Sequence, residues 1–412
     1  RMQIVAIDLL RRFRKLLVMT SGKKHDSFLS KPVNHFYLLI LSAGILSLIG
    51  LVMVFSASSI HSLDTKGSSY GIVLRQLFFL VVSIPLAGWL SKLSLERWYL
   101  IGKFGLVLSI GLQMMLFVPG LKKTVNGNTN WINLRVIDVQ PSELVKFLMI
   151  LWASTLLAKK MKAGHKTYNV AMLITPAFLF IMAMIMAGKD LGTTIVIAVI
   201  LMVLLFVSGV DLKILGIFAA IGATGVAFFI LTASYRKARF LSFINPFSAA
   251  DYKNAGWQPA HSILGLATGG IFGVGLGGSR QKWGNLAEAH TDFIFSVIGE
   301  ELGLIGALTV LILLGLLVYS IFRIALRAKD PMVRYACTAI GCWIAIQAFM
   351  NIGSATSIMP VVGVTLPLVS YGGSALLATM CGLGFVAGAA LRDPAVRKEV
   401  LAKISSSRAK SR

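Results

Sequence analysis

The sequence predicts an all-α, polytopic integral membrane protein with about ten transmembrane helices, and three observations support this prediction. First, 56% of the 412 residues are hydrophobic and only 14% are charged, whereas a soluble domain carries about 25% charged residues. Second, the apolar residues gather in runs near the ~20 residues that cross a bilayer. Third, the formal net charge of +24 is distributed unevenly between the segments that join these runs.

The apolar runs define the expected spans in chain order. They cover 36–57, 71–91, 99–118, 143–158, 169–187, 191–207, 212–233, 293–322, 335–353 and 374–391. The fourth is short and the eighth is long, which predicts tilt or an extension beyond the membrane. The spans form one transmembrane domain, 36–393, between a basic N-terminal tail, 1–35, and a basic C-terminal tail, 394–412. The N-terminal tail fits either a basic amphipathic helix on an anionic membrane surface or a disordered arm.

Lysine and arginine concentrate on one side of the membrane when both termini are placed in the cytoplasm. That topology assigns 27 of the 40 Lys and Arg residues to cytoplasmic segments, in agreement with the positive-inside rule. The net charge therefore needs no nucleic-acid partner, and none is expected. Five outer segments follow: 58–70, 119–142, 188–190, 354–373 and the large extracytoplasmic loop between helices seven and eight, 234–292.

The outer segment 354–373 is too apolar for an ordinary loop. Pro360, Gly363 and Pro367 prevent a regular helix there. We therefore expect the segment to re-enter the membrane or to pack on a cavity wall, where non-helical backbone is tolerated at membrane depth.

Ionisable residues inside or at the edge of apolar spans are costly and are the first candidates for a functional site. Glu143 and Lys146 stand three residues apart on one helix face and can pair, either as a structural ion pair or as part of a site. Asp190 opens a span and is expected to cap its helix. Glu300 and Glu301 lie inside the eighth span, so at least one of them must face a polar interior.

Asp292 has the strongest case for catalysis. It stands where the glycine-rich outer loop meets a span, beside Glu288, His290 and Thr291. Helix capping by Asp292 or Thr291 is the alternative, but it accounts neither for the neighbouring carboxylate nor for the basic stretch GGSRQK. An unperturbed aspartate titrates near ~3.9, so Asp292 would be ionised outside the cell and could accept a proton.

The outer loop also carries a basic patch. Arg236, Lys237 and Arg239 lie near its start, and Arg280 and Lys282 lie near its end. These side chains could hold an anionic head group such as a pyrophosphate, or they could form a solvated basic face. The glycine run between them permits close packing or close backbone approach to a ligand, but it follows no strand and is not a nucleotide-binding fingerprint.

Seven motifs make the chain similar to a known family. They are NGNTNWIN (126–133), QPSELVK (140–146), KDLGT (189–193), GVGLGGSRQK (273–282), EAHTDFIF (288–295), GEELG (299–303) and LPLVSYGGS (366–374). With them the membrane portion resembles, from the first span to the last, the SEDS family (FtsW and RodA), membrane glycosyltransferases that polymerise the peptidoglycan precursor lipid II. The residues of these motifs are more similar to those of the cell-division branch (FtsW) than to those of the elongation branch (RodA).

Three positions depart from the family pattern. Asn130 replaces a usual Arg, and Lys189 and Ala287 each replace a usual Pro. The first change could alter a substrate contact or be compensated by Arg135, while the other two indicate altered loop geometry.

The resemblance implies that Asp292 is the catalytic carboxylate. Lipid II, an undecaprenyl-pyrophosphate-linked disaccharide pentapeptide, carries an α-linked sugar, whereas the glycan is β-1,4-linked, so the reaction inverts. One carboxylate can act as general base on the acceptor 4-hydroxyl. Cations near the departing pyrophosphate can stabilise its charge, and the candidates are Lys146, Arg239 and Lys282. We expect Lys146 to lie near Asp292 and Glu143. The predicted substrate-binding residues are Glu143, Lys146, Arg239, Gln281, Lys282, Glu288 and His290.

The resemblance also implies partners and a location. A class B penicillin-binding transpeptidase and other divisome proteins are the expected partners, at the division septum of the bacterial inner membrane. No cofactor is assigned, although a divalent cation such as Mg²⁺ could assist, and no metal-ligating residues are assigned. The alternatives are a lipid II flippase, a RodA-like elongation polymerase and a non-catalytic scaffold. A transporter predicts a midplane site between inverted repeats, whereas the candidate residues stand at the outer edge and no repeat is evident.

Overall fold

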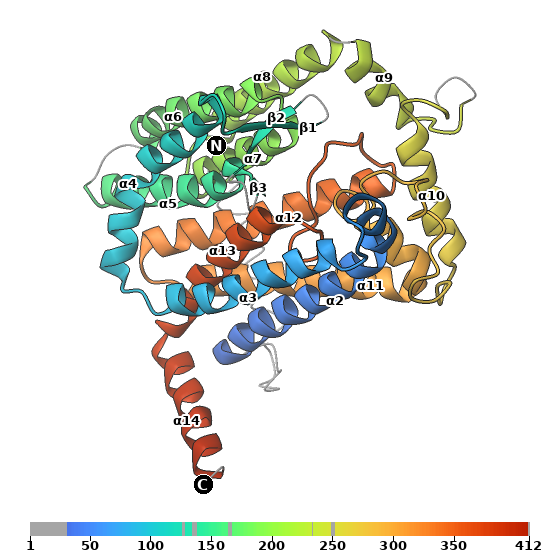
Figure 1. Cartoon of the computed structure of the whole chain (residues 1–412). Coiled ribbons are helices and arrows are strands. Elements are labelled where there is room, and N and C mark those ends of the chain that lie inside the picture. The colour runs from blue at the N-terminus through green and yellow to red at the C-terminus, as the bar shows by residue number, and fades with distance from the viewer. Residues whose placement is uncertain are drawn as a thin grey trace, which may run out of the picture.

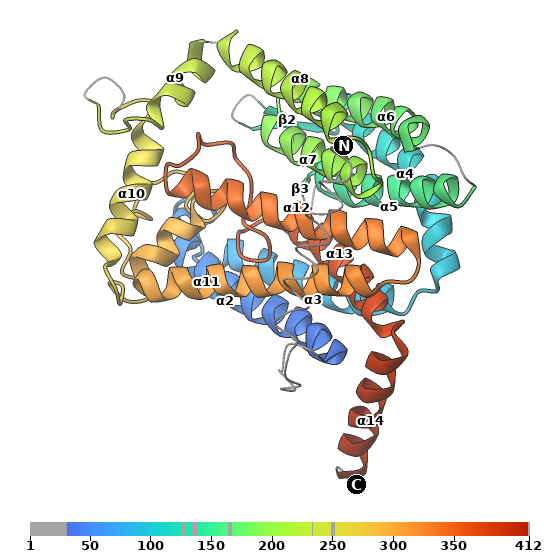
Figure 2. The same cartoon turned by 180° about the vertical axis from the view of Figure 1, so that it is seen from behind.

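The structure, a computed structural model, describes residues 31–125, 128–133, 138–163, 167–232, 234–248 and 252–410. Figures 1 and 2 show long helices packed side by side, with α14 (Pro394–Lys410) extending away from them. The predicted C-terminal tail therefore begins as a helix. The N-terminal amphipathic helix or disordered arm was predicted for a segment that lies almost entirely outside the described residues.

Each predicted span falls on a helix. These helices are α2 (Pro32–Lys66), α3 (Gly71–Ser91), α4 (Leu95–Met114), α5 (Pro141–Lys162), α6 (Thr167–Ala187), α7 (Leu191–Val207), α8 (Leu212–Leu231), α11 (Ile294–Arg327), α12 (Pro331–Ala355) and α13 (Gly373–Leu391). In the described part of the chain, seven are long and apolar enough to cross a bilayer, and α6, α7 and α8 contribute shorter apolar stretches. The polytopic α-helical fold is confirmed, while the count of ten spans stays a prediction.

The outer segment 119–142 contains a small sheet that the sequence did not predict. The strands β1 (Lys122–Val125), β2 (Asn128–Asn133) and β3 (Asp138–Val139) follow the 3₁₀ turn η2 (Met115–Phe117). They pair antiparallel in the order β1-β2-β3. The sequences KKTV of β1 and NTNWIN of β2 do not alternate between apolar and polar residues, which is the pattern by which a strand is predicted, and β3 has only two residues.

The large outer loop is partly helical. It contains α9 (Ser234–Ser242) and α10 (Trp257–Gly269), and α10 lies beside the start of α11 in both views (Figures 1 and 2). The two helices pack so closely that a Cβ on Gly269 would collide with the carbonyl of Gly299. The glycine run thus serves close packing, which was one of its two predicted uses.

The predicted long eighth span is two helices joined at Gly303. This residue has φ 67° and ψ −165°, a conformation that glycine adopts without the steric penalty of a side chain. A Cβ at Gly303 would collide with the backbone nitrogen of Gly273 and the carbonyl of Ile271. The break lets the loop after α10 lie against α11. The apolar run is long because it contains two helices, one before and one after Gly303.

Replacing Gly303 with Ala should therefore destabilise the protein by about 1–3 kcal/mol, the usual cost of backbone strain. Gly315 offers a matched control on the same helix, because a Cβ there would meet nothing within 4 Å, and Gly315→Ala should change stability by less than about 1 kcal/mol. Thermal unfolding in detergent measures both, and equal melting temperatures for the two variants would contradict the account of the break.

The segment between α12 and α13, called the buried segment below, is non-helical, as its prolines predicted, and most of its second half, 364–372, is buried. Leu366, Leu368 and Val369 are all buried. Glycine on a neighbouring helix leaves room for the backbone of this segment, since a Cβ on Gly50 of α2 would lie 2.6 Å from the Leu368 carbonyl oxygen. The segment therefore passes between helices rather than over the surface.

Predicted outer segments meet at one end of the helices. The Thr129 N–H donates to the Gly188 carbonyl at 3.1 Å, and the Tyr371 N–H donates to the His290 carbonyl at 2.9 Å. The first contact joins the sheet to the α6–α7 hairpin, and the second joins the buried segment to the residues before Asp292. The two pairs meet at the start of α7, where a Cβ on Gly192 would lie 2.6 Å from the Val362 carbonyl oxygen.

Candidate functional site

Asp292 lies in the turn that leads into α11 and does not cap that helix. The N-cap residue is Phe293, and no side chain makes a capping hydrogen bond there. The Thr291 hydroxyl instead donates to the Glu288 carboxylate at 2.9 Å. Neither Asp292 nor Thr291 is therefore the N-cap of α11, and the Asp292 side chain is partly buried in the turn before the helix.

The backbone around Asp292 is fixed by α12 and by the buried segment. The Asn351 side chain donates one hydrogen bond to the Asp292 carbonyl at 2.9 Å and another to the Val364 carbonyl at 2.7 Å. A Cβ on Gly363, which has φ 69°, would lie 3.5 Å from Asp292 Oδ2. The carboxylate thus faces the backbone of the buried segment, and the absence of a side chain at Gly363 keeps that approach open.

Aromatic rings surround the turn before Asp292. The His290 ring stacks on His61 of α2, with ring centroids 5.4 Å apart, and lies 5.6 Å from the Tyr371 ring. Burial raises the pKa of the Tyr371 hydroxyl, and the Arg75 guanidinium beside it opposes that rise. Tyr371 therefore keeps its proton at neutral pH and can donate a hydrogen bond.

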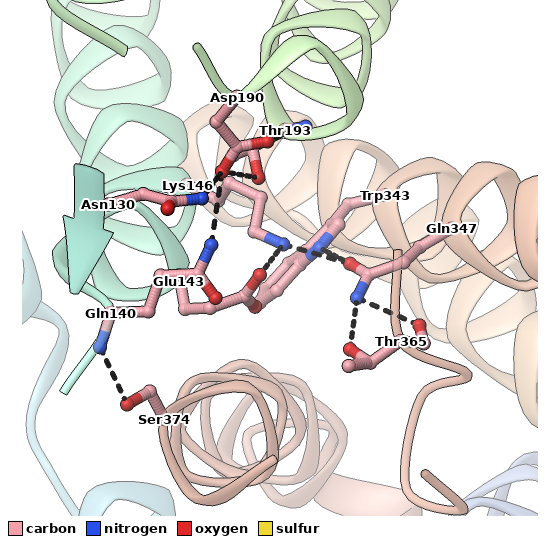
Figure 3. Close-up of polar contacts among 10 residues, drawn as sticks. All are labelled: Asn130, Gln140, Glu143, Lys146, Asp190, Thr193, Trp343, Gln347, Thr365 and Ser374. Carbon is pink, nitrogen blue, oxygen red and sulfur yellow. Dashed lines mark hydrogen bonds and ion pairs between the residues drawn. The ribbon is translucent and has the colours of Figure 1, made fainter. Parts of the chain in front are cut away.

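The predicted Glu143–Lys146 pair is present and fully enclosed (Figure 3). The Lys146 ammonium donates to Glu143 Oε1 at 2.8 Å and to Gln347 Oε1 at 2.9 Å. It also lies 5.1 Å from the centre of the Trp343 ring. The other Glu143 oxygen, Oε2, is buried with no hydrogen-bond partner among the described residues. Lys146 is thus held from three sides by α5 and α12.

Two amides of α12 connect this ion pair with the turn at Asp292. Gln347, which binds Lys146, donates to the Thr365 carbonyl at 3.1 Å, and Asn351 stands one turn further along the same helix. Lys146 and Asp292 are therefore linked indirectly, through neighbouring residues of the buried segment. Sequence reasoning missed both amides, although polar side chains four residues apart inside an apolar span are a detectable signal.

A second polar cluster lies around Asp190 (Figure 3). The carboxylate accepts the Thr193 N–H at 2.9 Å, so the predicted N-cap is confirmed. It also accepts hydrogen bonds from Gln140 at 3.0 Å and Asn130 at 3.2 Å. Asn130, which departs from the family pattern, thus joins the sheet to α7, and Arg135 lies outside the described residues.

Both carboxylates of the GEELG motif are buried and bound to the basic stretch of the loop. Glu300 accepts the Arg280 N–H at 2.9 Å. Glu301 accepts a hydrogen bond from Ser56 at 2.7 Å and forms an ion pair with Lys282 at 3.3 Å. The expectation that at least one of these glutamates faces a polar interior is confirmed for both.

The other predicted substrate-binding residues take different positions. The Lys282 charge is already paired inside the protein, which favours a structural role over contact with an anion. Gln281 is buried beside it, and its Oε1 has no hydrogen-bond partner among the described residues. Glu288 is exposed with φ 56°. The Arg239 side chain lies outside the described residues, so its assignment stays a prediction.

Removing the Lys282 charge should test its structural role. Lys282→Met leaves the Glu301 carboxylate buried without its cation, which should cost about 3–5 kcal/mol. The double variant Lys282→Met/Glu301→Gln should recover most of that loss, because neither charge remains unpaired. Thermal unfolding of the parent, the two single variants Lys282→Met and Glu301→Gln, and the double variant measures the coupling, and strictly additive effects would show that the pair does not matter.

No protein-only metal site is evident in the described chain. Among its residues, no group of three or more His, Cys, Asp or Glu side chains is placed to hold a metal ion. Mg²⁺ commonly binds through one or two carboxylates together with substrate phosphates. An assisting Mg²⁺ therefore stays a prediction.

Residues 36–393 match the family model of the cell cycle proteins FtsW, RodA and SpoVE. The chain belongs to this family. A probable peptidoglycan glycosyltransferase FtsW of Mycobacterium tuberculosis is 36% identical over 372 residues, which are 90% of this chain and 70% of that protein. The stage V sporulation protein E of Bacillus subtilis is 34% identical over 351 residues, which are 84% of this chain and 94% of that protein.

Solved structures of the FtsW/RodA/SpoVE family share the fold. A chain from a peptidoglycan synthase complex, studied for the coordination of polymerization and crosslinking, superposes with a TM-score of 0.67 at 25% identity, covering 86% of this chain and 97% of that chain. The rod shape determining protein RodA of Thermus thermophilus gives 0.62 at 27% identity, covering 86% and 96%. The predicted family and enzyme class are therefore confirmed.

Proposed function

We propose that this chain polymerises lipid II into β-1,4-linked glycan strands at the outer face of the bacterial inner membrane, with Asp292 as the general base. The observation that carries this proposal is the position of Asp292. Its carboxylate caps no helix, is partly buried, and lies against the Gly363 backbone at the end of the molecule where the predicted outer segments meet.

The chemistry follows from the substrate. The acceptor 4-hydroxyl loses its proton to Asp292 while its oxygen attacks the anomeric carbon of the donor sugar. The bond from that carbon to the pyrophosphate breaks, and undecaprenyl pyrophosphate leaves with the electron pair, so the α-linkage becomes a β-linkage. Pyrophosphate is already a good leaving group, and no strong general acid is needed.

The cations divide into two groups. Lys146 and Lys282 are enclosed and paired with carboxylates, so we assign them to holding the buried segment and the glycine loop in place. Lys237 and Arg280 are exposed on the large outer loop, and they are the better candidates among the described residues for contact with the pyrophosphate. This division revises the sequence-based choice of Lys146 and Lys282.

The proposed biological setting is septal cell-wall synthesis. The relatives named FtsW, and the solved relative that belongs to a peptidoglycan synthase complex, support action with a class B penicillin-binding transpeptidase and other division proteins. A RodA-like role in elongation is the alternative within the family.

A lipid II flippase is the second candidate. The Glu143–Lys146 pair enclosed between helices and the buried non-helical segment favour it, because buried charges and broken backbone are features of transporters. The position of Asp292 beside the outer segments favours the polymerase.

One reconstitution separates the two functions. The purified chain with its transpeptidase partner is given lipid II in liposomes, and glycan strands and lipid II transfer between leaflets are measured in parallel. We expect strands that a muramidase cleaves, formed from lipid II already in the outer leaflet. Transfer between leaflets without any strand would contradict the proposed function.

A further inference from the structure

The segment 270–277, here called the apolar loop, exposes large hydrophobic side chains on a predicted water-facing loop. Phe272 is 81% exposed, Leu276 is 63% exposed and Ile271 is 59% exposed. Scattered single apolar residues are normal on a surface, but a contiguous group marks an interaction site.

Part of the backbone of the apolar loop is paired with groups of α11 on both sides of the break at Gly303. The hydrogen bonds run from Val274 N to Glu300 O (3.0 Å), Gly275 N to Glu301 O (3.1 Å), Leu304 N to Gly270 O (2.9 Å) and Ile305 N to Ile271 O (3.3 Å). Backbone polar groups in hydrocarbon need internal partners. These four bonds provide such partners for groups that a continuous helix would have paired within itself.

The apolar loop continues the lipid-facing side of a candidate span. On α11, Leu304, Ile305 and Ile312 are exposed, and the helix is long and apolar enough to cross a bilayer. The twenty residues from Leu304 to Arg323 correspond to about 30 Å of helix, which matches the ~30 Å thickness of the hydrocarbon core. When Arg323 is placed at the inner boundary of the hydrocarbon core, Leu304 lies at its outer boundary. The apolar loop, which is bonded to Leu304 and Ile305, lies there too.

The residues that follow the apolar loop suit the interface between lipid and water. Trp283 is 70% exposed, and the Arg280 side chain is exposed as well. Tryptophan is enriched at membrane interfaces, and an arginine there can reach phosphate groups while its stem lies on apolar surface. The order of residues thus runs from apolar to interfacial as the chain leaves the loop.

We propose that the apolar loop is a membrane anchor, whose exposed side chains insert among the acyl chains of the outer leaflet. The same loop is bonded to Glu300 and Glu301, in the short half of α11 that begins directly after Asp292. The anchor therefore sets the height of Asp292 relative to the membrane surface, a consequence that rests on the proposed function, whereas the lipid contact does not.

Site-directed fluorescence tests the lipid contact without any activity measurement. Phe272→Cys and Leu276→Cys are made in a chain with its three native cysteines replaced by alanine, labelled with an environment-sensitive dye and placed in vesicles. Leu308→Cys on the exposed side of α11 is the lipid control, and Lys253→Cys on the exposed outer loop is the water control. If the cysteine-free chain does not fold, the native cysteines are kept and the signal of the labelled parent is subtracted.

The proposal predicts that brominated lipids quench positions 272 and 276 about as strongly as position 308. Iodide should quench them at least about tenfold less than position 253, because an ion does not enter hydrocarbon. Iodide quenching equal to that at position 253 would overturn the proposal. Protection from both quenchers would also overturn it, since it would show that protein, such as a second copy of the chain, covers the loop.

Discussion

Asp292→Asn is expected to lower the initial rate of glycan formation from lipid II by roughly 10²–10⁴-fold, the usual contribution of a general base. Asparagine has nearly the same shape but cannot accept the proton of the acceptor hydroxyl. The Asn351 side chain donates to the backbone carbonyl of residue 292. This hydrogen bond does not depend on the side chain of residue 292, so the fold should be preserved. Strand length on gels, measured with the transpeptidase partner present, gives the rate.

The control for this prediction is a carboxylate at the same end of the molecule. Asp64 is exposed on α2, in a segment that was predicted to face outward, and Asp64→Asn should leave the rate within about twofold, as expected for a surface substitution away from the site. Thermal unfolding shows whether either variant has lost its structure. A folded Asp292→Asn protein, or a folded Asp292→Ala protein, that makes strands as fast as the parent would remove Asp292 from the mechanism.

Lys146→Met should destabilise the protein by about 3–5 kcal/mol, because it leaves the buried Glu143 carboxylate without a cation. The Gln347 Oε1 would lose the hydrogen bond from Lys146 as well and would keep the one from the Trp343 indole N–H. Through Gln347 and Thr365 the change should also disturb the buried segment next to Asp292, so catalysis should fall together with stability. The double variant Lys146→Met/Glu143→Gln should recover much of the stability, and thermal unfolding of the set measures the coupling.

The chain provides an exposed ion pair for comparison. Lys123 and Asp138 in the small sheet are 2.8 Å apart, with side chains 42% and 31% exposed. Because water screens such pairs, Lys123→Met should cost less than about 1 kcal/mol. Equal losses for Lys123→Met and Lys146→Met would show that burial does not strengthen the Glu143–Lys146 pair.

The helices could be predicted because an apolar run of membrane length is typical of a transmembrane helix and rare in soluble structure. The break at Gly303 could not, because a glycine within GEELGLIG reads equally well as part of a helix and its φ depends on the loop that packs there. The small sheet was missed because the sequences of β1 and β2 do not alternate between apolar and polar residues, and because β2 is also bonded to the α6–α7 hairpin.

The candidate site could be predicted where an ionisable group stood in an apolar context. Asp292, Asp190 and the Glu143–Lys146 pair were found in this way, and local spacing was enough to predict the pair and the cap. The partners of Lys282 could not be found, since Glu301 and Ser56 reach it through tertiary packing. For the same reason the sequence assigned Lys282 to an anion site, whereas its charge is balanced inside the protein.

The most direct test of the central claim is a structure of the complex with its transpeptidase partner, a lipid II donor and a glycan acceptor. The account predicts that an Asp292 carboxylate oxygen lies about 2.6–3.2 Å from the acceptor 4-hydroxyl, the reach required of a general base. An acceptor hydroxyl held by Glu288 or another carboxylate, with Asp292 turned away, would contradict it.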